Sequence, residues 1–447
     1  MSETVRLSDY SPVPDDKAEY CRSLQSVLSE NNNDVYIYDG KDLRPSDRPL
    51  QLFKQYNDKY MTRQYVGAVT YCGENGEIKF AFGSRFDSLD GQFFLQYVIN
   101  ETLGTNSRVF KDMEPAAAPE HTFDLLLMMV FITQLKQAVR KGIFRRYCRF
   151  ERNDAKVRGS IDLGRHIKYN VMSDKGSNGK IAYSYREFTA ANSVCVLILK
   201  ALDMMERKYP EFIKQNMRDR EMRSAVRIIQ RHNPDWQAVK NHTVLSETRQ
   251  RITHSLYRCY EPLRITARLI LKHMGLDLYA DKNRSRAFGL LIDMPKLWER
   301  FIENAVFKAY RIPVKAQREF DILNGSYKMT PDFYREDPKF VLDAKYRPAW
   351  EQWLDDKKGN NVGIREDLFQ VLAYMYSLRC PAGGVVFPTK NPHEPEAFSP
   401  FAGREEGGER FWVFPLGVPE SGASFAAFSR AFKENCKKLA DAIKALK

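Results

Sequence analysis

The sequence has no long hydrophobic segment, and this absence excludes a class of protein. The longest strongly apolar run, LLLMMVFI at residues 125–132, is far shorter than the roughly 20 residues that span a bilayer. The N-terminus also lacks the basic region and apolar stretch of a secretory signal. The sequence therefore predicts no membrane span and no export, and we expect a cytoplasmic protein.

Clustered metal ligands and nucleotide-binding loops are missing as well. The seven cysteines contain no C-x-x-C pair, and no H-E-x-x-H motif occurs among the seven histidines. This pattern argues against a disulfide framework or a zinc site and fits a reducing compartment. The nearest approach to a phosphate-binding loop, at residues 176–180, lacks the G-x-x-x-x-G-K-[ST] spacing, so we expect this chain to bind no nucleotide itself.

What the sequence does have is length, ordinary apolar content and an excess of positive charge. Its 447 residues suggest two to three domains, and 43% hydrophobic with 28% charged residues is typical of globular proteins. Lys and Arg number 70 against 57 Asp and Glu, a net charge of +13. This surplus favours a polyanionic partner, either nucleic acid or an acidic membrane surface, without choosing between them.

Shifts in composition divide the chain into three parts and predict a mixed α/β, multidomain protein. Residues 1–118 are expected to form a β-rich N-terminal module, with a hairpin that starts at residue 65 and turns at GENGE. Residues 119–287 are expected to form a mainly helical middle domain with a strand pair, opening with an amphipathic helix at 122–141. Residues 288–447 are expected to form an α/β domain.

The strongest chemical signal lies in this third part, where an apolar strand ends in charged residues. The string KFVLDAKY, residues 339–346, predicts a strand that is buried near its start. Because side chains alternate along a strand, Asp343 and Lys345 should project from the same face. Burying such charges costs several kcal/mol each unless they are paired or bind a metal, so the pattern needs an explanation.

Asp332, which follows Pro331, supplies a second carboxylate nearby in the sequence. Two carboxylates brought together repel, and a divalent cation cancels this repulsion while gaining hard oxygen ligands. Asp332 and Asp343, with the Ala344 carbonyl, are suited to hold one Mg²⁺, with Mn²⁺ as a substitute. Lys345 would then orient or deprotonate a water that attacks a phosphodiester. The alternative is that Asp343 and Lys345 form a solvated ion pair on an edge strand.

Two flanking helices are predicted to complete this site. Residues 293–310 form an amphipathic helix that offers Glu299 and Glu303, four residues apart on one face. Either carboxylate can serve the metal, and Glu299 is the preferred candidate. A second helix is predicted over residues 365–374. Three polar residues lie along one side of it: Asp367, Gln370 and Tyr374.

These motifs resemble the PD-(D/E)xK nuclease superfamily, with P-D at 331–332 and D-x-K at 343–345. The second helix is similar to the Q-x-x-x-Y helix of RecB-like nucleases, which implies that Tyr374 contacts DNA. The resemblance implies five catalytic residues: Asp332, Asp343, Lys345, Glu299 and Gln370. It implies four residues around the metal: Asp332, Asp343, Ala344 and Glu299.

The order of segments is also similar to the McrC family, the nuclease subunits of modification-dependent restriction systems. Residues 157–167 (VRGSIDLGRHI) resemble the family's R-G-x-I-D…H-I stretch, and residues 185–192 (YREFTAAN) resemble its Y-x-E-x-T…N stretch. The resemblance covers roughly residues 65–390. It implies Mg²⁺-dependent DNA cleavage by residues 288–447 and a hetero-oligomer with an AAA+ GTPase of the McrB type, which this chain stimulates.

Other interpretations remain open at this point. If residues 144–150 form a strand, Arg145 and Arg149 share a face that contacts DNA phosphates, a protein partner or solvent alone. Trp350 and Trp353 are expected to be packing residues rather than platforms for base stacking. In place of a restriction subunit, the chain could be a stand-alone RecB-like repair nuclease or a non-cleaving, DNA-binding adaptor of the GTPase.

Overall fold

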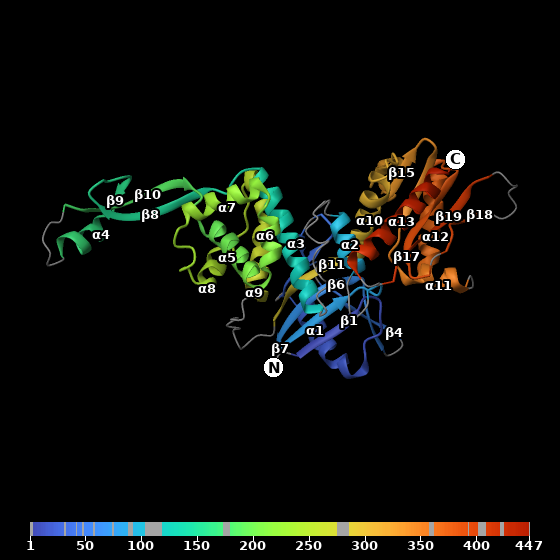
Figure 1. Ribbon diagram of the computed structural model, residues 1–447, viewed down its shortest axis with the longest axis horizontal. Coiled ribbons are helices and arrows are strands. Elements are labelled where there is room, and N and C mark those ends of the chain that lie inside the picture. Colours follow the sequence, from blue (N-terminus) through green and yellow to red (C-terminus); the bar gives the residue numbers. More distant parts are fainter. Residues whose placement is uncertain are drawn as a thin grey trace. The chain divides into compact units, whose positions relative to one another are not determined.

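The computed structural model describes residues 3–30, 33–41, 43–46, 49–56, 59–73, 76–87, 93–102, 119–172, 179–274, 286–356, 362–391, 393–400, 408–420 and 424–446. Its fold is mixed α/β, as predicted (Figure 1). The chain forms two compact units. The first unit combines Met1–Leu126 with Ala280–Lys447, and the second is Leu127–Tyr279. Part of the string 176–180 lies outside the described residues.

The first unit contains a six-stranded sheet in the order β1-β7-β6-β11-β2-β3. Its strands from the N-terminal part are β1 (Glu3–Ser8), β2 (Asn33–Tyr38), β3 (Leu43–Pro45), β6 (Tyr65–Gly73) and β7 (Gly76–Gly83). The predicted hairpin is confirmed, because β6 and β7 pair antiparallel across the turn. The sixth strand, β11 (Arg286–Asp293), lies between β6 and β2. The domain boundary predicted after residue 287 therefore falls inside a strand of this sheet.

Close approach of two backbones explains the glycines at the centre of this sheet. Gly67 has φ +140°, and a Cβ built there would lie 2.3 Å from the Leu290 carbonyl oxygen. A Cβ at Gly289 would lie 2.2 Å from the Ala68 carbonyl oxygen. Any side chain at either position would push β6 and β11 apart, so glycine is required where the late strand enters the N-terminal sheet.

Smaller elements complete the N-terminal part of this unit. Helix α1 (Ala18–Ser29) buries Cys21, Leu24 and Leu28 in the hydrophobic core that it shares with the sheet. A short antiparallel hairpin is formed by β4 (Phe53–Tyr56) and β5 (Lys59–Thr62). Helix α2 follows at Phe93–Thr102.

A second six-stranded sheet, in the order β12-β15-β16-β17-β19-β18, lies in the C-terminal part of the first unit. Its strands are β12 (Lys315–Ala316), β15 (Phe333–Glu336), β16 (Lys339–Ala344), β17 (Ala382–Thr389), β18 (Glu396–Phe398) and β19 (Arg410–Gly417). A separate hairpin pairs β13 (Phe320–Ile322) with β14 (Tyr327–Met329). The helices are α10 (Met294–Ile302), α11 (Pro348–Asp356), α12 (Val362–Leu378) and α13 (Phe425–Lys444).

The strand predicted at 339–346 is β16, and it is an interior strand. It pairs antiparallel with β15 and parallel with β17, and Asp343 is only 2% exposed. The alternative of a solvated pair on an edge strand is therefore wrong. The strand ends at Ala344, although the Lys345 N–H still donates to the Val386 carbonyl at 2.9 Å.

Tryptophan side chains pack beside this sheet, as the sequence suggested. Trp350 is 1% exposed, and its ring stacks on Phe387 with centroids 5.9 Å apart. Trp353 packs, partly buried, against the same hydrophobic core. These contacts assign both residues to packing.

The second unit is mainly helical and carries a three-stranded sheet, where the sequence predicted a strand pair. Its helices are α3 (Pro119–Arg140), α4 (Leu163–His166), α5 (Ser193–Lys208), α6 (Pro210–Asn216), α7 (Arg220–His232), α8 (Asn241–Glu247) and α9 (Tyr260–Met274). Its strands are β8 (Arg146–Asp154), β9 (Ser160–Ile161) and β10 (Ile181–Thr189), in the order β8-β10-β9. These strands and α4 extend from the helices as an arm (Figure 1). None of the helices in the described ranges is long and apolar enough to cross a membrane.

Candidate active site

A cavity of about 840 Å³ lies in the first unit where β16 ends. Residues from α10, the segment before β15, the end of β16 and α12 contribute to its lining. The cavity brings together all the residues that the sequence placed at a catalytic or metal site: Asp332, Asp343, Ala344, Lys345, Glu299 and Gln370.

Asp332 and Asp343 are held together by reciprocal hydrogen bonds. The Asp332 N–H donates to Asp343 Oδ1 at 3.2 Å, and the Ala344 N–H donates to Asp332 Oδ2 at 2.9 Å. Burial raises the pKa of Asp332 well above its ordinary value, and the neighbouring Asp343 and Glu299 carboxylates raise it further. The pair is therefore a site of concentrated negative potential.

Glu299 is the helix carboxylate that lines the cavity. Burial, followed by repulsion from Asp343, raises the pKa of Glu299 to about 7. Glu303 instead forms ion pairs with Arg300 at 3.4 Å and with Lys308 at 2.7 Å. The preferred candidate, Glu299, thus lies beside the two aspartates, whereas the Glu303 carboxylate is engaged in ion pairs with Arg300 and Lys308.

Lys345 is held between acceptors from two elements. Its Nζ lies 3.1 Å from Asp343 Oδ2 and 3.3 Å from Asp367 Oδ1, and it donates to Gln370 Oε1 at 2.9 Å. Burial by itself lowers the pKa of Lys345, but the Asp343 and Asp367 carboxylates raise it overall above its ordinary value. The ammonium is therefore charged and fixed in position.

The polar face of α12 connects this lysine to the loop before Asp332. Gln370 Nε2 donates to the Tyr374 hydroxyl at 2.8 Å, and that hydroxyl donates to the Thr330 carbonyl at 3.4 Å. Tyr374 is 8% exposed, so its hydroxyl makes these hydrogen bonds within the protein. The predicted contact of Tyr374 with DNA stays a prediction.

Gln317, which no sequence motif predicted to be part of the site, lies between β12 and β13. Its Nε2 donates to Asp332 Oδ1 at 2.8 Å and to Glu299 Oε2 at 3.3 Å, so one amide bridges two carboxylates. Gln317 also has φ +52°, a conformation that is uncommon for a residue with a side chain. No local motif marks it, because its role depends on residues from two other segments.

The residues present fit a magnesium ion. Within the described parts of the chain, no three His, Cys, Asp or Glu side chains converge into a complete ligand cluster. Mg²⁺ does not need one, because it keeps several waters and is usually bound through one or two carboxylates together with substrate phosphates. Asp332, Asp343 and the Ala344 carbonyl supply such a partial set of hard oxygens, and a cation there would relieve the repulsion that raises the pKa values of Asp332 and Glu299.

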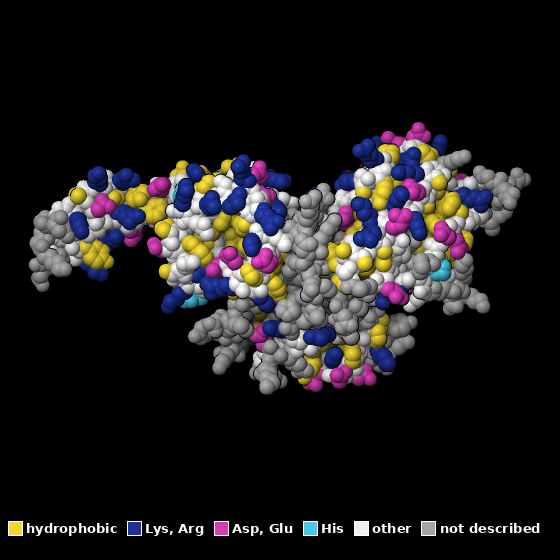
Figure 2. All heavy atoms as spheres, viewed as in Figure 1, with side chains coloured by type: hydrophobic (Ala, Val, Ile, Leu, Met, Phe, Trp, Pro, Cys, Tyr) yellow, Lys and Arg dark blue, Asp and Glu magenta, His cyan; other side chains and the backbone are white. Residues whose placement is uncertain are grey.

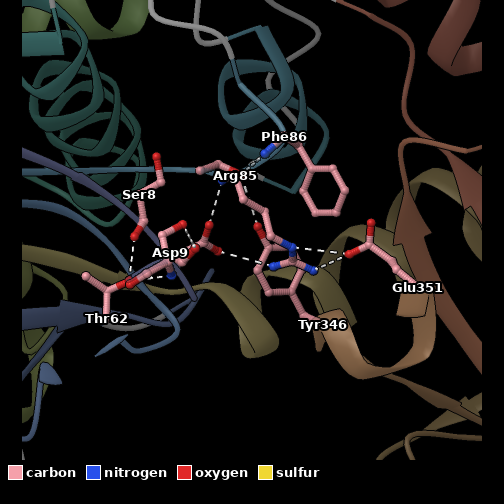
Figure 3. Close-up of polar contacts among 9 residues, drawn as sticks. Ser8, Asp9, Thr62, Arg85, Phe86, Tyr346 and Glu351 are labelled. Atoms are coloured by element: carbon pink, nitrogen blue, oxygen red, sulfur yellow. Dashed lines mark hydrogen bonds and ion pairs between the residues drawn. The ribbon is translucent and has the colours of Figure 1, made fainter. Parts of the chain in front are cut away.

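A buried polar network connects the end of β16 to the N-terminal part of the first unit (Figure 3). Arg85 donates to Glu351 Oε1 at 3.0 and 3.2 Å and lies 3.4 Å from Asp9 Oδ2. Its guanidinium lies over the Tyr346 ring, 4.5 Å from the centroid, and the Tyr346 hydroxyl is hydrogen-bonded to Ser84 Oγ at 3.0 Å. Tyr346 directly follows Lys345, so the network supports the backbone at the site.

The two arginines that were predicted to bind DNA lie in the second unit. Arg145 precedes β8 and Arg149 lies within it, and both are exposed. Arg149 Nε is 3.7 Å from Glu151 Oε1. Neither arginine is among the residues that line the cavity, and their contact with DNA stays a prediction.

The fold and the cavity together define a class: an α/β protein in which an interior strand presents Asp-x-Lys beside a second aspartate and a helical glutamate. A family model described as McrBC 5-methylcytosine restriction system component matches residues 61–388. This chain therefore belongs to that family of restriction-system components, which confirms the resemblance found in its motifs.

A solved structure shares this fold. One similar chain comes from the refined half-complex of a tetradecameric assembly of Thermococcus gammatolerans McrB AAA+ hexamers with bound McrC. It is 16% identical, with a TM-score of 0.50, over 98% of this chain and 100% of that chain. A chain of the T. gammatolerans McrBC complex solved by cryo-EM is 13% identical, over 70% of this chain and 89% of its own, with a TM-score of 0.28. No curated protein matches this sequence.

Proposed function

We propose that this protein is the DNA endonuclease subunit of a GTP-driven, modification-dependent restriction complex in the cytoplasm. It cuts phosphodiester bonds with Mg²⁺, for which Mn²⁺ can substitute, and it stimulates a partner AAA+ GTPase. One observation carries the proposal: Asp332, Asp343, Glu299 and Lys345 converge on a single cavity in a chain of the McrBC family.

The roles of the residues follow from their positions. Asp332, Asp343 and the Ala344 carbonyl would hold the metal, with Glu299 beside them. A bound Mg²⁺ supplies Lewis-acid polarisation of the phosphate and an activated water. Lys345, held as a cation by its acidic neighbours, orients that water and neutralises the charge that develops on the phosphate.

The arm of the second unit supports the proposed association with a GTPase. Large apolar side chains are exposed along this arm, with Tyr147, Leu163 and Met172 at 73%, 69% and 76%. Exposed apolar surface of this kind is typical of interaction sites. Figure 2 shows hydrophobic side chains among Lys and Arg on the visible face of the arm. McrC is bound to McrB AAA+ hexamers in the assembly of similar fold, and we propose that this arm contacts the equivalent partner here.

Cleavage by matched variants tests the proposal. Methylated and unmethylated plasmids are incubated with Mg²⁺, GTP, an AAA+ GTPase partner and either the wild type, Asp343→Asn or Asp321→Asn. Asp321 is the control, because it is an exposed aspartate on β13 outside the cavity lining. Asp343→Asn should slow cleavage by about 100-fold or more while GTPase stimulation persists. Asp321→Asn should cut like the wild type.

The outcomes separate the competing functions. Equal cleavage by Asp343→Asn and the wild type would refute the site. Cleavage that needs neither partner nor GTP would favour a stand-alone repair nuclease of the RecB-like kind. Stimulation of the GTPase without any cutting by the wild type would favour the DNA-binding adaptor.

A further inference from the structure

The cavity has a second wall that comes from the N-terminal part of the first unit. Five residues from the β4–β5 hairpin and the turn after it line this wall: Lys54, Met61, Thr62, Arg63 and Gln64. The Met294 N–H donates to the Gln64 carbonyl at 3.3 Å. This bond ties the wall to the first turn of α10, the helix that carries Glu299, so the wall and the carboxylates form one site.

The wall from the hairpin carries two basic residues and no carboxylate, whereas the rest of the lining includes Asp332, Asp343 and Glu299. Lys54 is exposed on β4, and Arg63 is half-buried directly after β5. The Arg63 guanidinium donates to Gln51 Oε1 at 3.0 Å, and because that amide is neutral the contact leaves the positive charge uncancelled. Two cationic side chains from this hairpin thus line the same cavity as Asp332 and Asp343.

We propose that Lys54 and Arg63 bind the phosphate backbone of DNA in the cavity that also contains the metal-binding carboxylates. This inference rests on the proposed nuclease function and names a substrate contact for it. The carboxylates repel a polyanion, and a single divalent cation offsets the charges of Asp332, Asp343 and Glu299 only in part. Cations from the β4–β5 hairpin add to the attraction, and arginine matches a phosphate through paired N–H donors.

Contacts of this kind position DNA without reading its sequence. Lys54 and Arg63 therefore suit a subunit that cuts wherever a partner delivers the duplex. A protein ligand would also meet a basic wall, but it has no phosphodiester for the Asp332–Asp343–Lys345 group. For this reason the cavity as a whole favours DNA.

Equilibrium DNA binding tests the assignment without relying on cleavage. The full chain with Asp343→Asn is titrated with a fluorescent duplex in Mg²⁺ at several salt concentrations, with and without Lys54→Ala plus Arg63→Ala. The control is Lys59→Ala, because Lys59 is exposed on the same hairpin but does not line the cavity. Arg63→Lys, which keeps the charge, is the conservative variant. Circular dichroism checks that each variant is folded.

Each lost phosphate contact should reduce the slope of log affinity against log salt by about 0.9, so the double variant should lose about 2. Its affinity should fall by at least about 10-fold at low salt, while Lys59→Ala keeps the parent slope and Arg63→Lys stays near it. An unchanged slope in a folded double variant overturns the inference, as does an equal loss in Lys59→Ala. If the wild type binds in this way but never cuts, the nuclease function fails while the DNA contact stands.

Discussion

Replacing Arg85 by methionine should strongly destabilise the first unit, because it leaves a buried carboxylate without its cation. Asp9 is fully buried, and the side chains of Arg85 and Glu351 are 13% and 20% exposed. After the change Asp9 keeps the hydrogen bond from the backbone N–H of residue 85, at 2.6 Å. Glu351 can turn toward water, but Asp9 cannot, so Asp9 dominates the cost.

The expected loss follows from the burial of this pair. Removing one partner of a buried ion pair costs about 3–5 kcal/mol. Stacking of Arg85 over Phe86 and Tyr346, at 4.4 and 4.5 Å, adds about 0.5–1 kcal/mol each, and methionine recovers part of the packing. The exposed pair Arg207–Asp203 is closer, at 2.7 Å, yet Arg207 is 75% exposed. Arg207→Met should therefore cost less than about 1 kcal/mol.

The loss should also depend on pH, with a defined sign. Burial raises the pKa of Asp9 above its ordinary value, and Arg85 lowers it in part. Removing Arg85 raises that folded-state pKa further. A group whose folded pKa is raised contributes stability at low pH that is lost as the pH rises through that pKa. Arg85→Met should therefore cost less near pH 5 than near pH 8, by roughly 1 kcal/mol or more.

Urea unfolding followed by tryptophan fluorescence measures this loss. Of the five tryptophans, the first unit contains four: Trp298, Trp350, Trp353 and Trp412. Adding Asp9→Asn to Arg85→Met should recover stability at pH 8 and remove most of the pH dependence. The reasoning is refuted if Arg85→Met costs less than about 1 kcal/mol at pH 8, or the same at both pH values.

Three further predictions concern the carboxylates and the central sheet. Asp332→Asn should raise the free energy of unfolding of the metal-free protein by about 1 kcal/mol or more, and with it the melting temperature, while abolishing cleavage. A lower melting temperature would contradict the repulsion inferred from the raised pKa of Asp332. The Mg²⁺-induced rise in melting temperature should grow as the pH passes through about 7, because Glu299 must lose its proton near that pH to attract the ion. Glu299→Gln should flatten this dependence, and an equal Mg²⁺ effect at pH 6 and pH 8 in the wild type would exclude Glu299 from the site. Gly67→Ala should cost about 2 kcal/mol or more in urea unfolding, since its Cβ would meet the Leu290 carbonyl; a neutral effect would show that β6 shifts freely.

Local sequence patterns were sufficient to predict several helices and strands of this protein. The helix predicted at 122–141 is α3, and the apolar string that ends in Asp-x-Lys is β16. These predictions succeeded because periodicity and strand preference are properties of consecutive residues. The motifs at residues 157–167 and 185–192, together with the order of segments, were also enough to identify the family, since each motif lies within one short segment.

Other features depend on contacts between distant segments, and only the tertiary structure decided them. The helical pattern offered both Glu299 and Glu303, with Glu299 preferred, and only the structure shows that Glu299 is the one that lines the cavity with the aspartates. Gln317 carries no motif, because its amide acquires a role only beside two carboxylates from other segments.

The sequence by itself determined the family, the mixed fold and the residue types of the candidate site, because motif spacing and periodicity are written in consecutive residues. The tertiary structure decided that β11 enters the N-terminal sheet and that Arg63 lines the same cavity as Asp343. The physical reason is that strand pairing and the burial of charge depend on which segments come into contact in the fold. No local sequence pattern reveals such a contact between residues far apart in the chain.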